Sequence, residues 1–144
     1  MTTISNVNLI STESLLNVIT REKNNNGATF TIKSKKTGKD FTYMIARKLY
    51  KGNWYTHVSV EAGYLQFKYL GSYFKGKIYS KGGEITTPSA IGISFVLWKV
   101  EARAFDWLDV QIEVMHLGNC LCCGKILTDA NSIKLGLGPI CASN

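Results

Sequence analysis

The sequence predicts an α+β protein built on an antiparallel β-meander of four to five strands, with one or two helices and a C-terminal zinc-knuckle module. Three observations support this prediction. Short segments of alternating polarity follow one another through the middle of the chain, an apolar stretch near residue 90 has helical spacing, and all four cysteines fall in the last 25 residues. With 144 residues, 45% of them apolar, the chain is long enough to bury a core of its own.

We divide the chain into three segments. Residues 1–27 are predicted to form an N-terminal arm and a short helix, residues 28–115 a basic α+β core domain, and residues 116–144 a zinc-binding module packed on that core. In the first segment, Ser11 or Thr12 is a suitable N-cap, because a short apolar stripe with helical spacing follows it.

The core domain begins with a predicted β-hairpin. Residues 29–33 and 41–45 alternate in polarity, as strands with one buried face do, and the lysine-rich turn 35–40 joins them. Residues 54–61 and 65–70 continue this pattern. We therefore expect four or five short antiparallel strands that follow one another in sequence order.

The segment 88–103 fits either a helix or a strand. Thr87 followed by Pro88 is typical of a helix start, whereas the β-branched residues that follow also fit a strand. The apolar residues spaced as on one helix face are Ile91, Phe95, Trp98, Ala102 and Phe105. We predict a helix here, followed by a strand at 110–114 that leads directly into the cysteine-rich segment.

The bunched cysteines indicate a single metal site. Cys120 and Cys123 form a C-x-x-C knuckle, which supplies two of the four ligands of a tetrahedral zinc ion. Cys141 is the expected third ligand, because the two glycines before it permit a second tight turn. His116, four residues before the knuckle, is the expected fourth. Four protein ligands leave zinc no open position, so the site is expected to be structural.

Two alternatives concern the cysteines. Cys122 can replace Cys120 or His116 as a ligand, or it can be a small buried apolar side chain, which is the interpretation we favour. The four cysteines can also form a disulfide framework. Because the sequence shows no signal peptide and has no cysteine before residue 120, we expect reduced thiols instead.

The cysteine-rich segment also resembles a known family. Between residues 116 and 141 the motifs H-x-G-x-C-x-x-C-G, Leu-Thr, Ser-Ile and G-x-G-P-x-C occur in this order. They are similar to a short zinc-ribbon-like domain of unknown function found in bacteriophage and prophage proteins. The resemblance implies zinc ligation by His116, Cys120, Cys123 and Cys141 and a viral or mobile-element origin. It implies no biochemical activity.

Positive charge is concentrated in the middle of the chain. Residues 33–81 contain eleven basic residues against two acidic ones, a net charge of +9, so the remainder nets −2 of the total +7. Such a field captures polyanions, and we expect nucleic acid or a nucleotide to bind a basic, aromatic-containing sheet surface. The residues expected to contact it are Lys33, Lys35, Lys36, Lys39, Arg47, Lys48, Lys51, Lys68, Lys75, Lys77, Tyr55 and Tyr73. The alternative is a solvated lysine-rich surface that aids solubility.

The sequence contains no catalytic motif. It has no phosphate-binding glycine loop and no serine-nucleophile signature, and its two histidines are far apart, so we predict that the protein is not an enzyme. The alternative function is a phage inhibitor that binds a host bacterial defence or transcription protein, or that sequesters a signalling nucleotide. Because no apolar run reaches the roughly 18 residues of a membrane span, we expect no membrane association and a location in the host bacterial cytoplasm.

Overall fold

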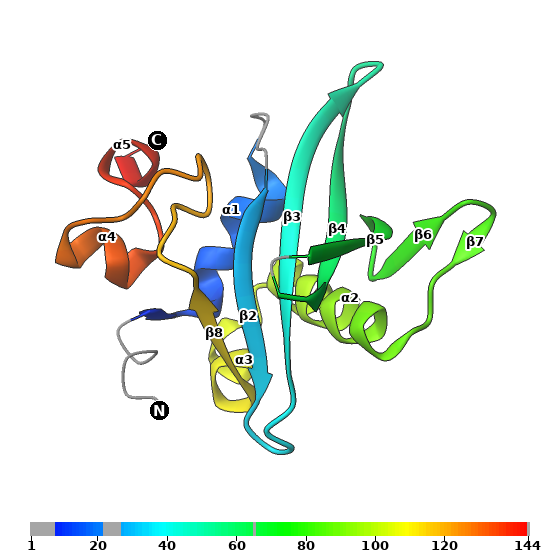
Figure 1. The fold of residues 1–144 in the computed structure, drawn as a ribbon, viewed down its shortest axis with the longest axis horizontal. Helices are drawn as coiled ribbons and strands as arrows, with labels where there is room; N and C mark the ends of the chain where they lie inside the picture. The colour runs from blue at the N-terminus through cyan, green and yellow to red at the C-terminus, as the bar shows by residue number, and fades with distance from the viewer. Residues whose placement is uncertain (1–7, 22–26, 65, 144) are drawn as a thin grey trace.

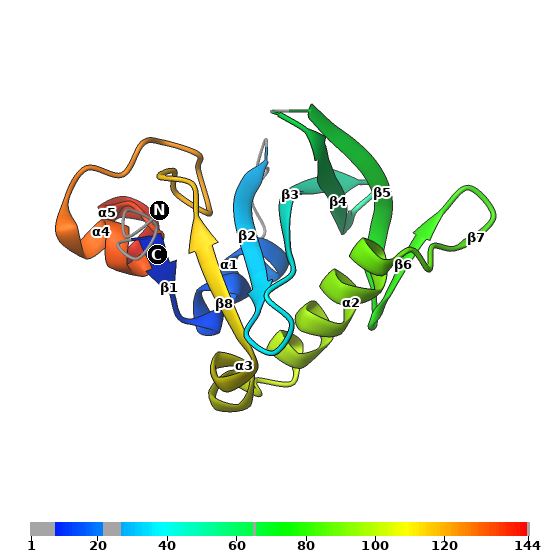
Figure 2. The ribbon, with the colours of Figure 1, turned by 60° about the horizontal axis from the view of Figure 1, so that its bottom comes forward.

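The computed structural model describes residues 8–21, 27–64 and 66–143, which form one antiparallel sheet with helices on one of its faces (Figures 1 and 2). The strands are β1 (Leu9–Ile10), β2 (Ala28–Ser34), β3 (Asp40–Tyr50), β4 (Asn53–Gly63), β5 (Gln66–Phe74), β6 (Lys77–Ser80), β7 (Gly83–Glu84) and β8 (Ile112–His116). The helices are the 3₁₀ helix η2 (Thr12–Leu15), α1 (Leu16–Thr20), α2 (Pro88–Glu101), α3 (Phe105–Gln111), α4 (Ala130–Leu135) and α5 (Pro139–Ser143). The predicted α+β class is confirmed.

The sheet order is β1-β8-β2-β3-β4-β5-β6-β7. Strands β2 to β7 are neighbours in space as in sequence, which is the predicted meander. Strand β8 then returns to the far edge and pairs with both β2 and β1, so that Val114 lies opposite Ile32 and Ile10. The described residues thus form eight strands, more than the four to five predicted, because the two-residue strands β1 and β7 are too short to show alternation.

The core lies between the sheet and helices α1, α2 and α3, which all cover the same face (Figure 2). Alternate residues of the strands point into it, and those with 0–1% exposure include Phe30, Tyr43, Ile45 and Val58. The Tyr43 hydroxyl donates to the Ser89 carbonyl oxygen of α2 at 2.7 Å, and burial raises the Tyr43 pKa. No helix of the described residues covers the opposite face, which we call the open face.

Helix α2 begins where the sequence predicts. The Thr87 hydroxyl accepts a hydrogen bond from the Ala90 N–H at 3.4 Å, and Pro88 occupies the first turn. The helix face that carries Ile91, Phe95 and Trp98 does not pack on the core, however. These side chains are 42–54% exposed. The residues of α2 that pack on the core are Ser89, Ala90, Ile93, Ser94, Val96, Leu97 and Val100.

Strand β5 contains a bulge that decides which of its residues reach the open face. The register with β4 shifts between the pairs Val58–Gly71 and Ser59–Tyr69. Gly71 has a φ of 150°, and a Cβ atom there would lie 2.3 Å from the Tyr79 carbonyl oxygen, so no other residue fits without a shift. After this bulge Tyr73 points toward the helices.

Part of the predicted N-terminal arm, residues 1–7, and the residues 22–26 that follow α1 lie outside the described residues. Within the described part of the chain, no helix has the length and apolar character needed to cross a membrane.

Candidate metal centre and basic sheet surface

A tight turn after β8 presents the first thiol of the candidate metal centre. The Gly124 N–H donates to the Cys120 carbonyl oxygen at 3.0 Å and closes the turn. Three further backbone N–H groups donate to the Cys120 sulfur: those of Cys122 (3.3 Å), Cys123 (3.5 Å) and Gly138 (3.3 Å). Because N–H dipoles aimed at sulfur favour its negative form, this turn is suited to holding a thiolate.

The thiols of Cys123 and Cys141 lie close to that of Cys120. The Sγ atoms of Cys120, Cys123 and Cys141 all lie within 4.8 Å of one another; Cys123 is exposed, and the other two are buried. A tetrahedral ion with metal–sulfur distances of about 2.3 Å separates its ligand sulfurs by about 3.8 Å. A small inward movement of the thiols therefore satisfies this geometry, and the three cysteines fit a metal ion. They are three of the four ligands expected from the sequence.

Helix α4 sets the position of Cys141 relative to the knuckle. Asp129 caps α4 by accepting the Ser132 N–H at 3.3 Å, and hydrogen bonds from the Ser132 side chain and backbone lower the Asp129 pKa. Gly136 ends α4 with a φ of 73°, a left-handed conformation that glycine adopts readily. Its carbonyl oxygen accepts the Leu121 N–H at 2.8 Å, which ties the end of α4 to the knuckle.

The two buried thiols of the cluster differ in acidity. Burial raises the Cys120 pKa, but the N–H groups of Gly138, Cys123 and Cys122 outweigh it and bring this pKa down to about 7. Burial, followed by the neighbouring thiols, raises the Cys141 pKa to about 12. Cys120 is therefore the first of the pair to become a thiolate, and a bound cation would have to displace the proton of Cys141.

The structure does not bring His116 to the thiols. Its imidazole is completely buried; Nδ1 accepts the Gly118 N–H at 2.9 Å, and Nε2 lies 2.7 Å from the Ile133 carbonyl oxygen. These partners assign a neutral ring with its proton on Nε2, donated to Ile133, and leave neither nitrogen for a metal. His116 instead joins the end of β8 to α4. The prediction that His116 is the fourth metal ligand is therefore corrected. Without it, the argument that four protein ligands enclose the ion no longer holds.

We expect the replacement of His116 by alanine to destabilise the fold and to leave the metal content unchanged. The change leaves two partly buried backbone groups, the Gly118 N–H and the Ile133 carbonyl, without their partners, at up to about 1–3 kcal/mol each, and it adds a cavity. Thermal unfolding and elemental analysis of the purified variant measure the two effects separately. A variant that keeps its melting temperature and loses its metal would instead identify His116 as a ligand.

Cys122 stands apart from the three clustered thiols. Its side chain is buried and touches that of Cys141, yet its sulfur is not among those that lie within 4.8 Å of one another. This position agrees with the interpretation of Cys122 as a small buried side chain.

The cysteine-rich segment is bonded to the N-terminal helices. Nη2 of Arg21 donates to the Cys141 carbonyl oxygen at 2.6 Å, and the Ser14 hydroxyl donates to the Leu135 carbonyl oxygen at 2.9 Å. Both bonds connect residues more than a hundred positions apart in sequence. The metal centre therefore sits beside η2, α1 and β1, at the opposite edge of the sheet from β7 (Figure 1).

The structure divides the predicted basic residues between the two ends of β3. Lys35, Lys36 and Lys39 belong to the β2–β3 turn, and Lys35 donates from Nζ to the Asp109 carbonyl oxygen at 2.7 Å. Lys51 lies in the β3–β4 turn, beyond the eleven residues of β3, and Lys48 lies within β3 near that end; eleven residues of extended strand span about 33 Å. A single continuous basic surface therefore does not form.

The remaining lysines follow the same division. Lys75 and Lys77 flank the β5–β6 turn, beside the start of β4, and therefore belong to the end of the sheet that carries Lys48. Lys77 pairs with Glu84 at 3.7 Å. Lys68 lies opposite Val60 further along β4, and Lys33 lies opposite Glu113 of β8.

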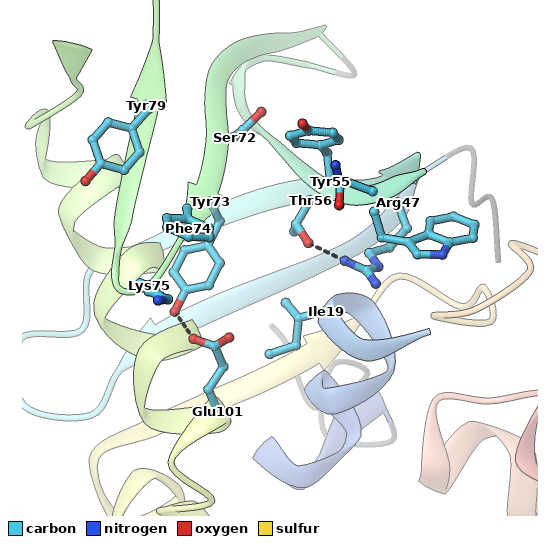
Figure 3. Close-up of a pocket in the computed structure, with 12 residues that line it drawn as sticks. Ile19, Arg47, Tyr55, Thr56, Ser72, Tyr73, Phe74, Lys75, Tyr79 and Glu101 are labelled. Atoms are coloured by element: carbon cyan, nitrogen blue, oxygen red, sulfur yellow. Dashed lines mark hydrogen bonds between the residues drawn. The ribbon is translucent and has the colours of Figure 1, made fainter. Parts of the chain in front are cut away.

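Two predicted contact residues face the helices and are buried. Arg47 donates to the Arg21 carbonyl oxygen and to the Thr56 hydroxyl, both at 3.0 Å. Tyr73 donates a short hydrogen bond to Glu101 of α2, and its pKa is raised by burial and by Glu101. Figure 3 shows both side chains on the helix side of the strands, where they help to line a pocket of about 610 Å³. They brace the sheet against α1 and α2, which corrects their prediction as nucleic-acid contacts.

Tyr55 does reach the open face, where it joins an arrangement that the sequence did not reveal. Consecutive ring centroids lie 6.3 Å apart from Tyr50 to Tyr55, 6.3 Å from Tyr55 to His57 and 5.9 Å from His57 to Tyr69. We call these four residues the aromatic ladder. The three tyrosines are 39–59% exposed, so the ladder offers ring surface to solvent across β3, β4 and β5.

A pocket of about 460 Å³ lies along the aromatic ladder, lined by Lys48, Leu49, Tyr50, Tyr55, His57 and Ser72. Nδ1 of His57 is 3.1 Å from both the Tyr69 and the Ser72 hydroxyl oxygens. Burial, and then the charge of Lys48, lower the His57 pKa. His57 is therefore neutral near pH 7, and the positive charge of this pocket comes from Lys48.

Comparison with known protein families gives a match for the C-terminal segment. A model described as a family of unknown function (DUF6011) matches residues 113–144, which contain the three clustered cysteines. No curated protein and no solved structure matches the chain. The C-terminal segment is thus similar to a family without an assigned activity.

Proposed function

We propose that this protein is a non-enzymatic binding module for single-stranded nucleic acid, which it holds on the open face of its sheet. The observation that carries the proposal is the aromatic ladder with Lys48 and Lys51 beside it. Lys48 lies directly opposite Tyr55 in the sheet, and Nζ of Lys51 lies 5.3 Å from the centroid of the Tyr50 ring. Rings that stack on bases next to cations that contact phosphates are the usual components of single-strand sites.

Single strands fit this surface better than a duplex does. The paired bases of a duplex present only their edges, whereas unpaired bases offer their flat faces to aromatic side chains. The ladder crosses three neighbouring strands, so that successive bases can contact successive rings. The pocket beside Lys48 is within the size range of small-ligand sites and is large enough for one base.

We propose that zinc occupies the three-cysteine cluster and holds the C-terminal segment together. An all-thiolate donor set is soft and suits zinc, and the N–H groups around Cys120 match the turn of a zinc knuckle. The ion supplies a cross-link between the knuckle and α5. It lies at the β1 edge of the sheet, away from the aromatic ladder, so we assign it a structural role.

Replacing Tyr55 with alanine tests the proposed function. Stacking of a base on an aromatic ring contributes about 1–3 kcal/mol, so the affinity for a labelled single-stranded oligonucleotide should fall about 5- to 150-fold. Fluorescence anisotropy with DNA and RNA single strands, a duplex and a mononucleotide measures both the loss and the preferred ligand. Tyr55→Phe keeps the ring and should bind nearly as the parent does.

Tyr64 provides a control at another exposed site. It is 87% exposed on the turn between β4 and β5, and Tyr64→Ala should bind normally. Equal affinity of the parent and the Tyr55→Ala variant for every single strand would refute the proposed site. Stronger binding of the duplex than of the single strand would refute the proposed ligand.

A further inference from the structure

Helix α2 carries apolar residues on its solvent-exposed side as well as on the side that packs on the core. Its inner residues pack on the sheet and on α1, while Ile91, Phe95 and Trp98 point outward at positions i, i+4 and i+7. Trp107 of α3 and, one turn further along the same helix, Val110 are also exposed, at 46% and 67%. We call these five residues the α2–α3 aromatic face. A helix that is apolar all round is normally covered on all sides.

The rings of this face hold one another in place. The centroid of Phe95 lies 6.4 Å from Trp98 and 6.0 Å from Trp107. Nζ of Lys99 lies 5.0–5.6 Å from the centroids of all three rings. A Cβ on Gly76 would come within 3.4 Å of Trp98, so the β5–β6 turn supports that ring from behind. Rings fixed in this way lose little conformational entropy when a partner covers them.

We propose that the α2–α3 aromatic face is the interface of a homodimer, with a second copy of this chain as its partner. Three half-exposed rings present on the order of 300 Å² of apolar surface, and the two aliphatic residues add on the order of 100 Å². Two copies thus offer about 800 Å². Homodimer interfaces are about 65% apolar, so the complete contact would bury about 1,200 Å², which is the lower end of stable interfaces.

The order of the residues along α2 suits a twofold contact. Phe95 lies near the middle of the outward stripe, with Ile91 one turn before it and Trp98 one turn after it. When two copies of α2 run antiparallel about an axis near Phe95, Ile91 of one copy meets Trp98 of the other, and the same contact recurs across the axis. A patch that complements itself in this way satisfies the requirement of an isologous interface. The proposal is independent of nucleic-acid binding, because the open face lies on the other side of the sheet.

Light scattering after size-exclusion chromatography tests the proposal over a dilution series. We expect twice the chain mass of 16.0 kDa at high concentration, and 16.0 kDa for Trp98→Glu and Phe95→Glu at the same concentration. Because both side chains already contact solvent, these variants should keep the parent's circular dichroism spectrum. Tyr64→Glu, at an exposed site remote from α2 in the sequence, should remain dimeric.

Tryptophan fluorescence identifies the interface independently of the variants. Dilution of the parent should shift the emission to the red as Trp98 and Trp107 become exposed, and the shift should follow the loss of dimer mass. Three outcomes would overturn the proposal: a monomer at all concentrations, a dimer that survives both glutamate variants, and a monomer whose emission shifts only when a different protein is added.

Discussion

Replacing Cys141 with serine is expected to abolish metal binding and to unfold the C-terminal segment. The parent should contain about one zinc ion per chain, and the variant close to none, because only two clustered thiols remain. Structural zinc contributes on the order of 10 kcal/mol to folding in small zinc modules, so α5 should lose its protection from amide exchange. Elemental analysis and hydrogen exchange measure these two effects.

Cys122→Ser is the matched control for this experiment. The replaced thiol is buried next to Cys141, but it lies outside the group of three, so zinc should remain at the parent level. If Cys141→Ser retained full zinc, the cluster would not be the metal site. If Cys122→Ser lost the metal, Cys122 would be a ligand and the alternative left open by the sequence would be correct.

Reversing the charges of Lys48 and Lys51 is expected to remove most of the affinity for single-stranded nucleic acid. Both lysines adjoin the aromatic ladder, and charge complementarity at such a surface changes association on the order of tenfold or more. If each lysine neutralises one phosphate, the log–log salt slope should become shallower by about 1.4. Salt titrations of Lys48→Glu/Lys51→Glu by fluorescence anisotropy give both values.

Lys36 and Lys39 supply a control with an identical change in net charge. They are exposed at the opposite end of β3, so Lys36→Glu/Lys39→Glu changes the overall field equally without touching the ladder. This variant should retain most of the affinity and the original salt slope. An equal loss in both double variants would show that the total charge of the protein, and not this surface, attracts the nucleic acid.

Local patterns in the sequence predicted the β2–β3 hairpin, the start of α2 at Thr87 and Pro88, and the meeting of Cys120, Cys123 and Cys141. Each of these depends on neighbouring residues or on a short motif. The alternation of Tyr43, Ile45 and Arg47 in β3 also contained the signal that Arg47 points inward. Alternation along a strand indicates the face of a residue more strongly than its charge does, so the buried position of Arg47 follows from its neighbours in β3.

Features that depend on register or on tertiary packing were not predictable in this way. A one-residue shift reverses the faces of a strand, and the bulge at Gly71 introduces such a shift before Tyr73. The aromatic ladder joins residues of three strands, so it needs the cross-strand register that no single segment contains. His116 stands beside the knuckle in sequence, yet hydrogen bonds to Gly118 and Ile133 direct its ring elsewhere.

The position of β8 in the sheet affects how this protein folds while the ribosome is still synthesising it. Strand β2 is an interior strand only after residues 112–116 have been made, roughly eighty residues later than β2 itself. Until then the nascent meander exposes the unpaired backbone of β2 as a free edge, which other unfinished chains can extend. Translation that stalls before residue 112 would therefore release a product prone to aggregation.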